Sequence, residues 1–214
     1  MWWRLAVLTG LFFGVSRIWT NEAPVFRGTA IVYHNPVNGH YYQWIQRSGI
    51  DWQAALDQAA RCRFAGQAGH LATITSQDEQ RFLGQTMRLG NGLWIAASDA
   101  EQEGTWKWVA GEEAGETFFV IGEGPVEDKF SNWVDNEPNN YHDDEDYAVV
   151  GWMNEAKWND LSATSNQAQG YLVEYAGLPH PEKLILTTGN TFSPQFGSER
   201  PTIVGEKDGN SWRW

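Results

Sequence analysis

The sequence has a single cysteine, Cys62, in 214 residues, so no intrachain disulfide can form. This scarcity favours a reducing compartment, although exported bacterial proteins without disulfides are also ordinary. Basic residues are scarce too: 15 Lys and Arg stand against 27 Asp and Glu, which gives a net charge of −12. This balance argues against binding to nucleic acid or to an anionic membrane surface, because both need a basic footprint, but it permits a bound cation.

The sequence also lacks an apolar run of the roughly 20 residues that a membrane-spanning helix needs. Residues 5–15 are mostly apolar and follow Arg4, which is typical of the hydrophobic part of a signal peptide. Gly14 and Ser16 supply small residues at a plausible cleavage site. A buried N-terminal strand or helix is the alternative. We interpret residues 1–16 as a signal peptide and expect a secreted or cell-surface protein.

The hydrophobic periodicity predicts an α+β fold in which two early helices flank antiparallel sheets. The first helix begins near Trp52 after a cap at Ser48 or Asp51, and Gly66 ends it. The second begins at a capping box formed by Ser76 and Glu79. Strands are expected at residues 29–33, 40–45, 71–74, 93–97, 105–109, 147–153, 157–161 and 171–175.

The composition divides the chain after the signal peptide into two parts. Residues 29–176 form the folded domain. Residues 177–214 contain several prolines and little apolar patterning, so we interpret them as a C-terminal extension or linker with the composition of a disordered segment.

One segment, residues 135–146, is rich in acids and has no Lys or Arg. Such crowding is repulsive unless the loop is fully solvated or holds a cation. The segment mixes Asp and Glu with Asn, and these oxygen donors suit Ca²⁺, whereas no cluster of Cys and His indicates zinc. His142 is alone and fits a solvated loop histidine. The spacing does not fit an EF-hand. On composition alone, a solvated surface loop and a calcium site remain equally open.

The order of short motifs resembles that of the C-type lectin-like domains over residues 37–176. Glu137-Pro138-Asn139 resembles the sugar-specificity motif of that family, and Trp158-Asn159-Asp160 resembles its second calcium motif. Glu145 stands eight residues after Glu137, as in calcium-binding members. Further landmarks occur in family order: Trp52, Ala59 and Cys62; Gly69-His70-Leu71-Ala72 and Ile74; Trp94-Ile95-Ala96-Ala97; Gly104-Thr105-Trp106-Lys107-Trp108; and Asn132-Trp133.

This resemblance implies the C-type lectin fold with a long calcium-binding loop. It implies a cis bond before Pro138 and a Ca²⁺ site whose ligands are Glu137, Asn139, Glu145, Asn159 and Asp160. Two vicinal sugar hydroxyls would complete the coordination and would bond to Glu137, Asn139, Glu145 and Asn159, because a hydroxyl can donate to an acid while it accepts from an amide. The Glu-then-Asn order resembles members that take mannose-type sugars with equatorial 3- and 4-hydroxyls. An accessory calcium site would use Asp99, Glu103, Asn140 and Asp146.

The sequence departs from the family at its disulfides. Cys62 matches one bridge position, but its partner position is Val173, and the other pair is Tyr147 and Ser162. Losing a disulfide from a small domain typically costs about 2–5 kcal/mol. We hypothesise that packing by tryptophans and a bound metal offset this loss.

We expect glycans or glycoconjugates as partners. Many lectin-like domains bind proteins instead, so a non-catalytic protein-binding or structural module with a Ca²⁺-stabilised loop is the alternative. Catalysis is not expected. Paired carboxylates can hydrolyse glycosides, but no nucleophile and base are paired here, and Cys62 lies on the apolar side of its predicted helix.

Overall fold

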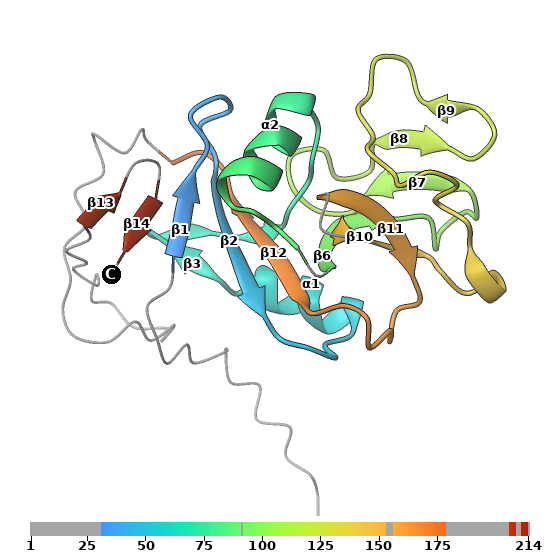
Figure 1. Ribbon diagram of the computed structural model, residues 1–214, viewed down its shortest axis with the longest axis horizontal. Coiled ribbons are helices and arrows are strands. Elements are labelled where there is room, and N and C mark those ends of the chain that lie inside the picture. Colours follow the sequence, from blue (N-terminus) through green and yellow to red (C-terminus); the bar gives the residue numbers. More distant parts are fainter. Residues whose placement is uncertain (1–30, 91, 153–155, 179–205, 209–210, 214) are drawn as a thin grey trace, which may run out of the picture.

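A computed structural model describes residues 31–90, 92–152 and 156–178, together with the backbone of two short strands at 206–208 and 211–213. It shows the expected α+β fold, in which two helices flank a mostly antiparallel sheet (Figure 1). The predicted signal peptide at residues 1–16 lies outside the described residues. Among the described residues, no helix has the length and apolar character needed to cross a membrane.

The main sheet runs in the order β13-β14-β1-β2-β12-β6-β7-β8-β9, with β5 beside β12 and the β10–β11 pair beside β6. Its described pairings are antiparallel except for that between β12 and β6. The strands are β1 (Ile31–His34), β2 (Tyr41–Gln46), β5 (His70–Leu71), β6 (Leu93–Ser98), β7 (Thr105–Trp108), β8 (Thr117–Val120), β9 (Gly124–Pro125), β10 (Tyr147–Trp152), β11 (Lys157–Leu161), β12 (Gly170–Tyr175), β13 (Glu206–Asp208) and β14 (Ser211–Arg213).

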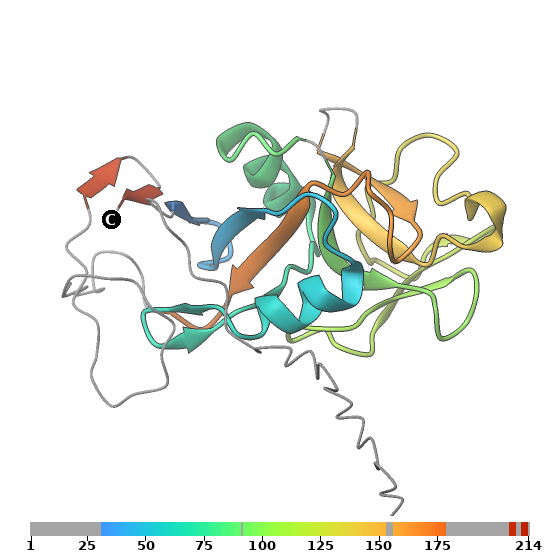
Figure 2. The same cartoon turned by 90° about the horizontal axis from the view of Figure 1, so that it is seen from below.

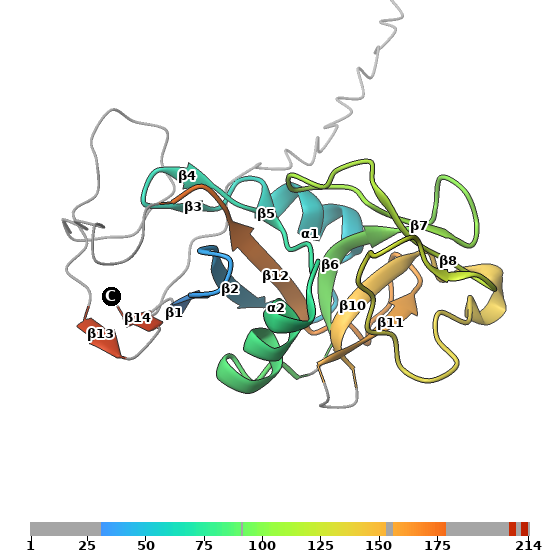
Figure 3. The same cartoon turned by 90° about the horizontal axis from the view of Figure 1, so that it is seen from above.

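The two helices, α1 (Trp52–Ala59) and α2 (Gln77–Arg81), lie on opposite faces of the β2–β12 part of the sheet (Figures 2 and 3). The Asp51 side chain caps α1 by accepting from the backbone N–H of Ala54 at 2.6 Å. Ser76 caps α2 by accepting from the backbone N–H of Glu79 at 3.2 Å, and a π-helical turn (Phe82–Thr86) continues this helix. Both predicted helix starts are therefore confirmed.

The predicted end of the first helix at Gly66 is wrong. The helix stops at Ala59, and a hairpin of β3 (Arg63–Phe64) and β4 (Gln67–Ala68) follows. Gly66 has a φ of +85° and forms the turn of this hairpin, since glycine adopts a positive φ without steric cost. Cys62 is buried after the helix end, and burial raises the pKa of its thiol to about 11, as suits a small core residue.

The segment between residues 111 and 132, for which no regular structure was expected, contains β8 and β9. The C-terminal extension contains β13 and β14, and β14 pairs with β1 in the register Val32↔Trp212. These strands are three residues long or shorter except for β8, which has four, and such lengths give too few alternations for a periodicity signal.

The core is unusually aromatic. Trp94, Trp106 and Trp158 are completely buried, and the indole N–H groups of Trp94 and Trp158 donate to Ile50 O and Gln80 Oε1 at 2.9 and 2.8 Å. Trp133 packs against both Trp106 and Trp158, with ring centroids 4.7 and 5.5 Å away. This cluster supports the segment that contains the candidate site.

Candidate functional site

The acidic segment forms a loop that leaves the core at Trp133 and returns into β10, and it lies beside β11 (yellow in Figure 1). The backbone N–H of Val134 donates to Trp158 O at 2.9 Å, which fastens the start of the loop to β11. The antiparallel β10–β11 pairing places Ala148 opposite Asp160 and Val149 opposite Asn159. The fold therefore brings the Asn159 and Asp160 motif next to a loop that lies about twenty residues earlier in the sequence.

Asp160 connects the strand to the loop directly. Its side chain is completely buried, and its two oxygens accept from the backbone N–H groups of Asn139 at 3.2 Å and Asn140 at 2.7 Å. The peptide bond between Glu137 and Pro138 is cis, as the resemblance implies. Charged acceptors make strong hydrogen bonds, so Asp160 holds the backbone of the motif in place.

Glu145 closes the other end of the loop. Its carboxylate accepts from the backbone N–H of Tyr141 at 3.1 Å, and its own N–H donates to Asn140 Oδ1 at 3.0 Å. The rings of Tyr141 and His142 are in contact with centroids 4.0 Å apart and a tilt of 50°, and both residues are exposed. His142 thus lies at the surface, as expected of a solvated loop histidine.

Two oxygen atoms of this site are buried without a hydrogen-bond partner: Glu137 Oε2 and Asn159 Oδ1. The amide nitrogen of Asn159 donates to Asp160 O at 2.7 Å, which leaves the side-chain carbonyl as the unpaired end. Buried polar atoms are nearly always paired, and leaving one unpaired costs about 1–3 kcal/mol. An unpaired acid oxygen on the loop and an unpaired amide oxygen on the adjoining strand β11 fit the ligand chemistry of a hard cation.

The electrostatics agree with this interpretation. Burial raises the pKa of Glu137 to about 7, and the nearby charges of Asp160 and Glu145 add to the shift. Burial also raises the pKa of Glu145, with Asp160 and Asp144 contributing. Carboxyl groups that repel one another in this way are stabilised when a cation enters among them.

Acidic groups alone do not make the site. In the part of the chain that the structure describes, no group of three or more His, Cys, Asp and Glu side chains is arranged to hold a metal ion. The candidate site depends on Asn139 and Asn159 as well, and amide oxygens are ordinary Ca²⁺ ligands.

The predicted accessory residues lie next to this site. Asp99 is buried, its Oδ2 accepts from the Gly104 N–H at 2.9 Å, and its Oδ1 has no partner. Burial, with smaller contributions from the charges of Glu103 and Asp146, raises the pKa of Asp99 to about 7. The Asp99 N–H donates to Asp146 O at 3.2 Å. Asn140, in contrast, uses its side-chain oxygen within the loop, as described above.

Sequence reasoning did not single out Gln80, which links α2 to this region. Its side chain accepts from the Trp158 indole at 2.8 Å and donates to Ala156 O. It also missed the cluster that His40 forms with the buried acids Glu79 and Glu174, because Glu174 lies 134 residues after His40 and only the capping role of Glu79 leaves a local signal.

Comparison with known proteins identifies the family. The family model for the lectin C-type domain matches residues 50–171. The chain is 38% identical over 141 residues to halomucin of Haloquadratum walsbyi (strain DSM 16790 / HBSQ001), which is 66% of this chain but 2% of halomucin. It is 29% identical over 131 residues to lectin BRA-3 of Megabalanus rosa, which is 61% of this chain and 68% of that lectin.

The solved structures agree on the fold. The C-type lectin CEL-I from Cucumaria echinata has a TM-score of 0.50 at 22% identity, over 67% of this chain and 94% of CEL-I. The family model covers more than half of the chain and includes both helices and the candidate loop. The chain therefore belongs to the lectin C-type domain family.

Proposed function

We propose that the chain is a non-catalytic, calcium-dependent carbohydrate-binding domain. The observation that carries this proposal is the pair of buried, unpartnered oxygens, Glu137 Oε2 and Asn159 Oδ1, at a loop that Asp160 fastens to β11. Glu137, Asn139, Glu145, Asn159 and Asp160 would hold the metal. When bound, Ca²⁺ supplies open coordination positions for two neighbouring hydroxyl groups.

The side chains around the metal would select the sugar. Glu137 and Glu145 would accept the hydroxyl protons, while the amides of Asn139 and Asn159 would donate to the hydroxyl oxygens. Asn159 uses one amide hydrogen for Asp160 O, so the second remains for the sugar. The Glu-then-Asn order supports mannose-type sugars with equatorial 3- and 4-hydroxyls, on glycans outside the cell. We also propose secretion or display at the cell surface.

A glycan array with and without Ca²⁺ tests the proposal. We expect binding of mannose-type glycans that EDTA abolishes. Asn139→Asp keeps an oxygen for the metal but removes the amide donor, so it should retain Ca²⁺ and lose sugar. Asp144→Asn is the matched control, because Asp144 is an exposed acid of the same loop outside the proposed ligand set.

Two outcomes would contradict the proposal. Tight Ca²⁺ uptake without glycan binding would favour the protein-binding or structural alternative. Turnover of model glycosides that survives EDTA would show an enzyme.

A further inference from the structure

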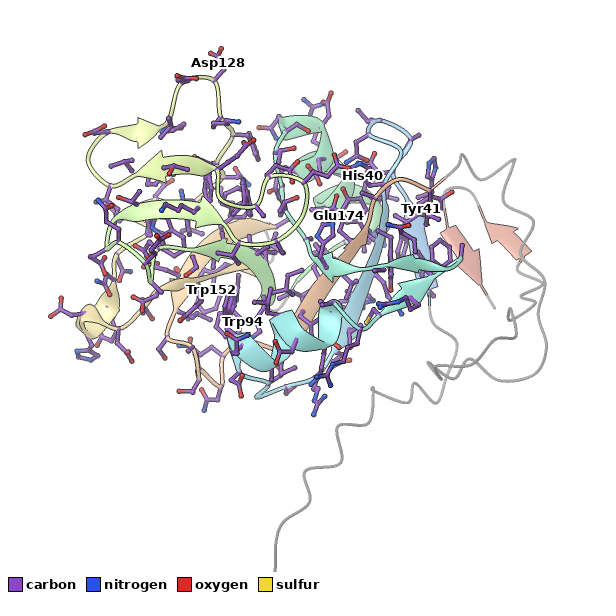
Figure 4. The ribbon with its side chains drawn as sticks, turned by 180° about the vertical axis from the view of Figure 1, so that it is seen from behind. His40, Tyr41, Trp94, Asp128, Trp152 and Glu174 are labelled. Atoms are coloured by element: carbon purple, nitrogen blue, oxygen red, sulfur yellow. The ribbon has the colours of Figure 1, made fainter. Side chains whose placement is uncertain are left out.

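A second group of ionisable side chains, in which the two carboxyl groups are buried and His40 is half-buried, lies away from the acidic loop, where α2 meets the sheet. His40 precedes β2, Tyr42 lies in β2, Glu79 in α2 and Glu174 in β12. His40 Nδ1 and Glu174 Oε1 are 2.5 Å apart, and Figure 4 shows the two side chains together. Glu79 and Glu174 are each only 2% exposed. None of these four residues belongs to the proposed calcium and sugar site.

Both carboxyl groups share one hydroxyl. The Tyr42 hydroxyl oxygen lies 2.5 Å from Glu79 Oε1 and 3.1 Å from Glu174 Oε1, and it also accepts from the Asn38 amide at 2.8 Å. A hydroxyl has one proton, so it can donate to only one of the two acids at a time. If Glu79 carries a proton, it donates to Tyr42, Tyr42 donates to Glu174, and every contact is satisfied.

The remaining oxygens of both acids are already used. Glu79 Oε2 accepts from the Thr75 N–H at 2.9 Å, and Glu174 Oε2 accepts from the Thr73 N–H at 3.0 Å. The Thr73 hydroxyl lies 2.9 Å from Glu113 Oε2 and 3.2 Å from Glu174 Oε2, and its single proton can likewise be donated to only one of these two acids at a time. The groups that face this cluster from neighbouring elements are His70 of β5, whose Nδ1 is 4.0 Å from Glu174 Oε2, and Glu112 and Glu113 after β7.

We propose that His40, Tyr42, Glu79 and Glu174 form a proton-operated latch, which holds α2 to β2 and β12 when Glu79 and His40 are protonated and weakens as both lose their protons. In the weakened state two buried carboxylates meet across a single tyrosine hydroxyl. The repulsion between them falls on the contact between α2 and the sheet, because Glu79 is the residue that α2 contributes.

The direction of the pH dependence follows from the two groups. Burial raises the pKa of Glu79 from 4.5 to about 7, and the charge of Glu174 adds to the shift. The hydrogen bond to Glu174 raises the pKa of His40 above 6.5, against the opposing effect of burial. The folded state therefore binds more protons than the unfolded state between pH 4.5 and about 7. The contribution of Glu79 to stability is full below pH 4.5, falls as the pH rises above 4.5 and is lost above about pH 7, whereas that of His40 is full below pH 6.5 and is lost as the pH rises through its raised pKa.

The latch adjoins the candidate site through one residue. Gln80 follows Glu79 in α2 and holds Trp158, which directly precedes Asn159 and Asp160. Loosening of α2 would thus act on β11 as well as on the β2–β12 face.

Urea unfolding of the full chain in EDTA at pH 5.5 and pH 8.0, followed by far-ultraviolet circular dichroism, tests the latch. We expect the unfolding equilibrium constant of the wild type to rise with pH, and Glu79→Gln to reduce that rise by about tenfold or more, because glutamine cannot ionise. His40→Gln should lose stability at pH 5.5 and little at pH 8.0. Glu123→Gln, an exposed acid between β8 and β9, should follow the wild type.

The same pH dependence in Glu79→Gln and in the wild type would overturn the latch. Since Glu79→Gln could fail to fold, the wild type alone provides a second measurement. The His40 ring, followed by nuclear magnetic resonance, should titrate above 6.5, and a midpoint at or below 6.5 would also overturn the proposal.

Discussion

The substitution Asp160→Asn isolates the role of one buried carboxylate from that of any metal. Asp160 accepts two backbone N–H groups of the loop, from Asn139 and Asn140. Asparagine keeps one acceptor oxygen and turns an amide donor toward the other N–H, so one strong contact is lost. A hydrogen bond to a charged group contributes about 1.5–3 kcal/mol. We therefore expect a loss of about 2 kcal/mol without metal, equivalent to roughly 4–8 °C in Tm for a domain of this size.

The pH of this measurement matters because Asp160 also repels Glu137. Burial and the Asp160 charge raise the pKa of Glu137 to about 7, so at pH 6 Glu137 is mostly protonated and the repulsion that the substitution would relieve is small. Differential scanning calorimetry at pH 6 in EDTA measures the loss, and Asp144→Asn serves as the control. An unchanged Tm for Asp160→Asn would refute the claim that this carboxylate holds the loop. Repeating the scan with Ca²⁺ should show a smaller gain than in the wild type.

Three further outcomes follow from the same structure. Saturating Ca²⁺ at a hundred times Kd should stabilise the wild type by about 2.7 kcal/mol, and a Tm that EDTA leaves unchanged would contradict the idea that metal offsets the missing disulfides. Glu137→Gln should stabilise the metal-free protein at pH 8 by about 1 kcal/mol, because it removes a carboxylate whose pKa is raised; this value is reduced for solvent screening, since the group is partly exposed. The same substitution should weaken Ca²⁺ binding in a calorimetric titration. Gly170→Ala places a Cβ 2.0 Å from Ile45 O, so we expect the free energy of unfolding in urea to fall by more than about 3 kcal/mol. Gly122→Ala has open space around the new Cβ and should lower it by only about 1 kcal/mol, the cost of a positive φ. Equal losses for the two variants would contradict this prediction.

Much of the fold could be predicted because local signals and tertiary structure agree. Asp51 and Ser76 cap helices as their positions in the sequence indicate, and the apolar run of β6 is completely buried. The end of α1 could not be predicted in this way. Cys62 continues the apolar spacing of the helix, and only the fold shows that Gly66 turns a hairpin instead of closing the helix.

The candidate site shows a similar division. Its composition indicates oxygen ligands for a cation, and the motif order indicates which residues to consider. Composition cannot show that Glu137 Oε2 and Asn159 Oδ1 stay unpaired while Asp160 uses both oxygens on the backbone, since those facts depend on the pairing of β10 with β11. The His40 and Glu174 contact spans 134 residues and leaves no pattern in the sequence.

The tryptophans beneath the acidic loop also give the chain a distinctive optical property. Trp133, at the start of the loop, packs within 4.7 Å of Trp106 and 5.5 Å of Trp158, at interplanar angles of 64° and 79°. Indole transitions at such short range and steep angles couple as excitons, and the sign and strength of the resulting near-ultraviolet bands depend on ring geometry. Any rearrangement that moves Trp133 relative to Trp106 and Trp158 would alter those bands. Movement at the start of the loop can therefore be followed in the near ultraviolet without an attached label.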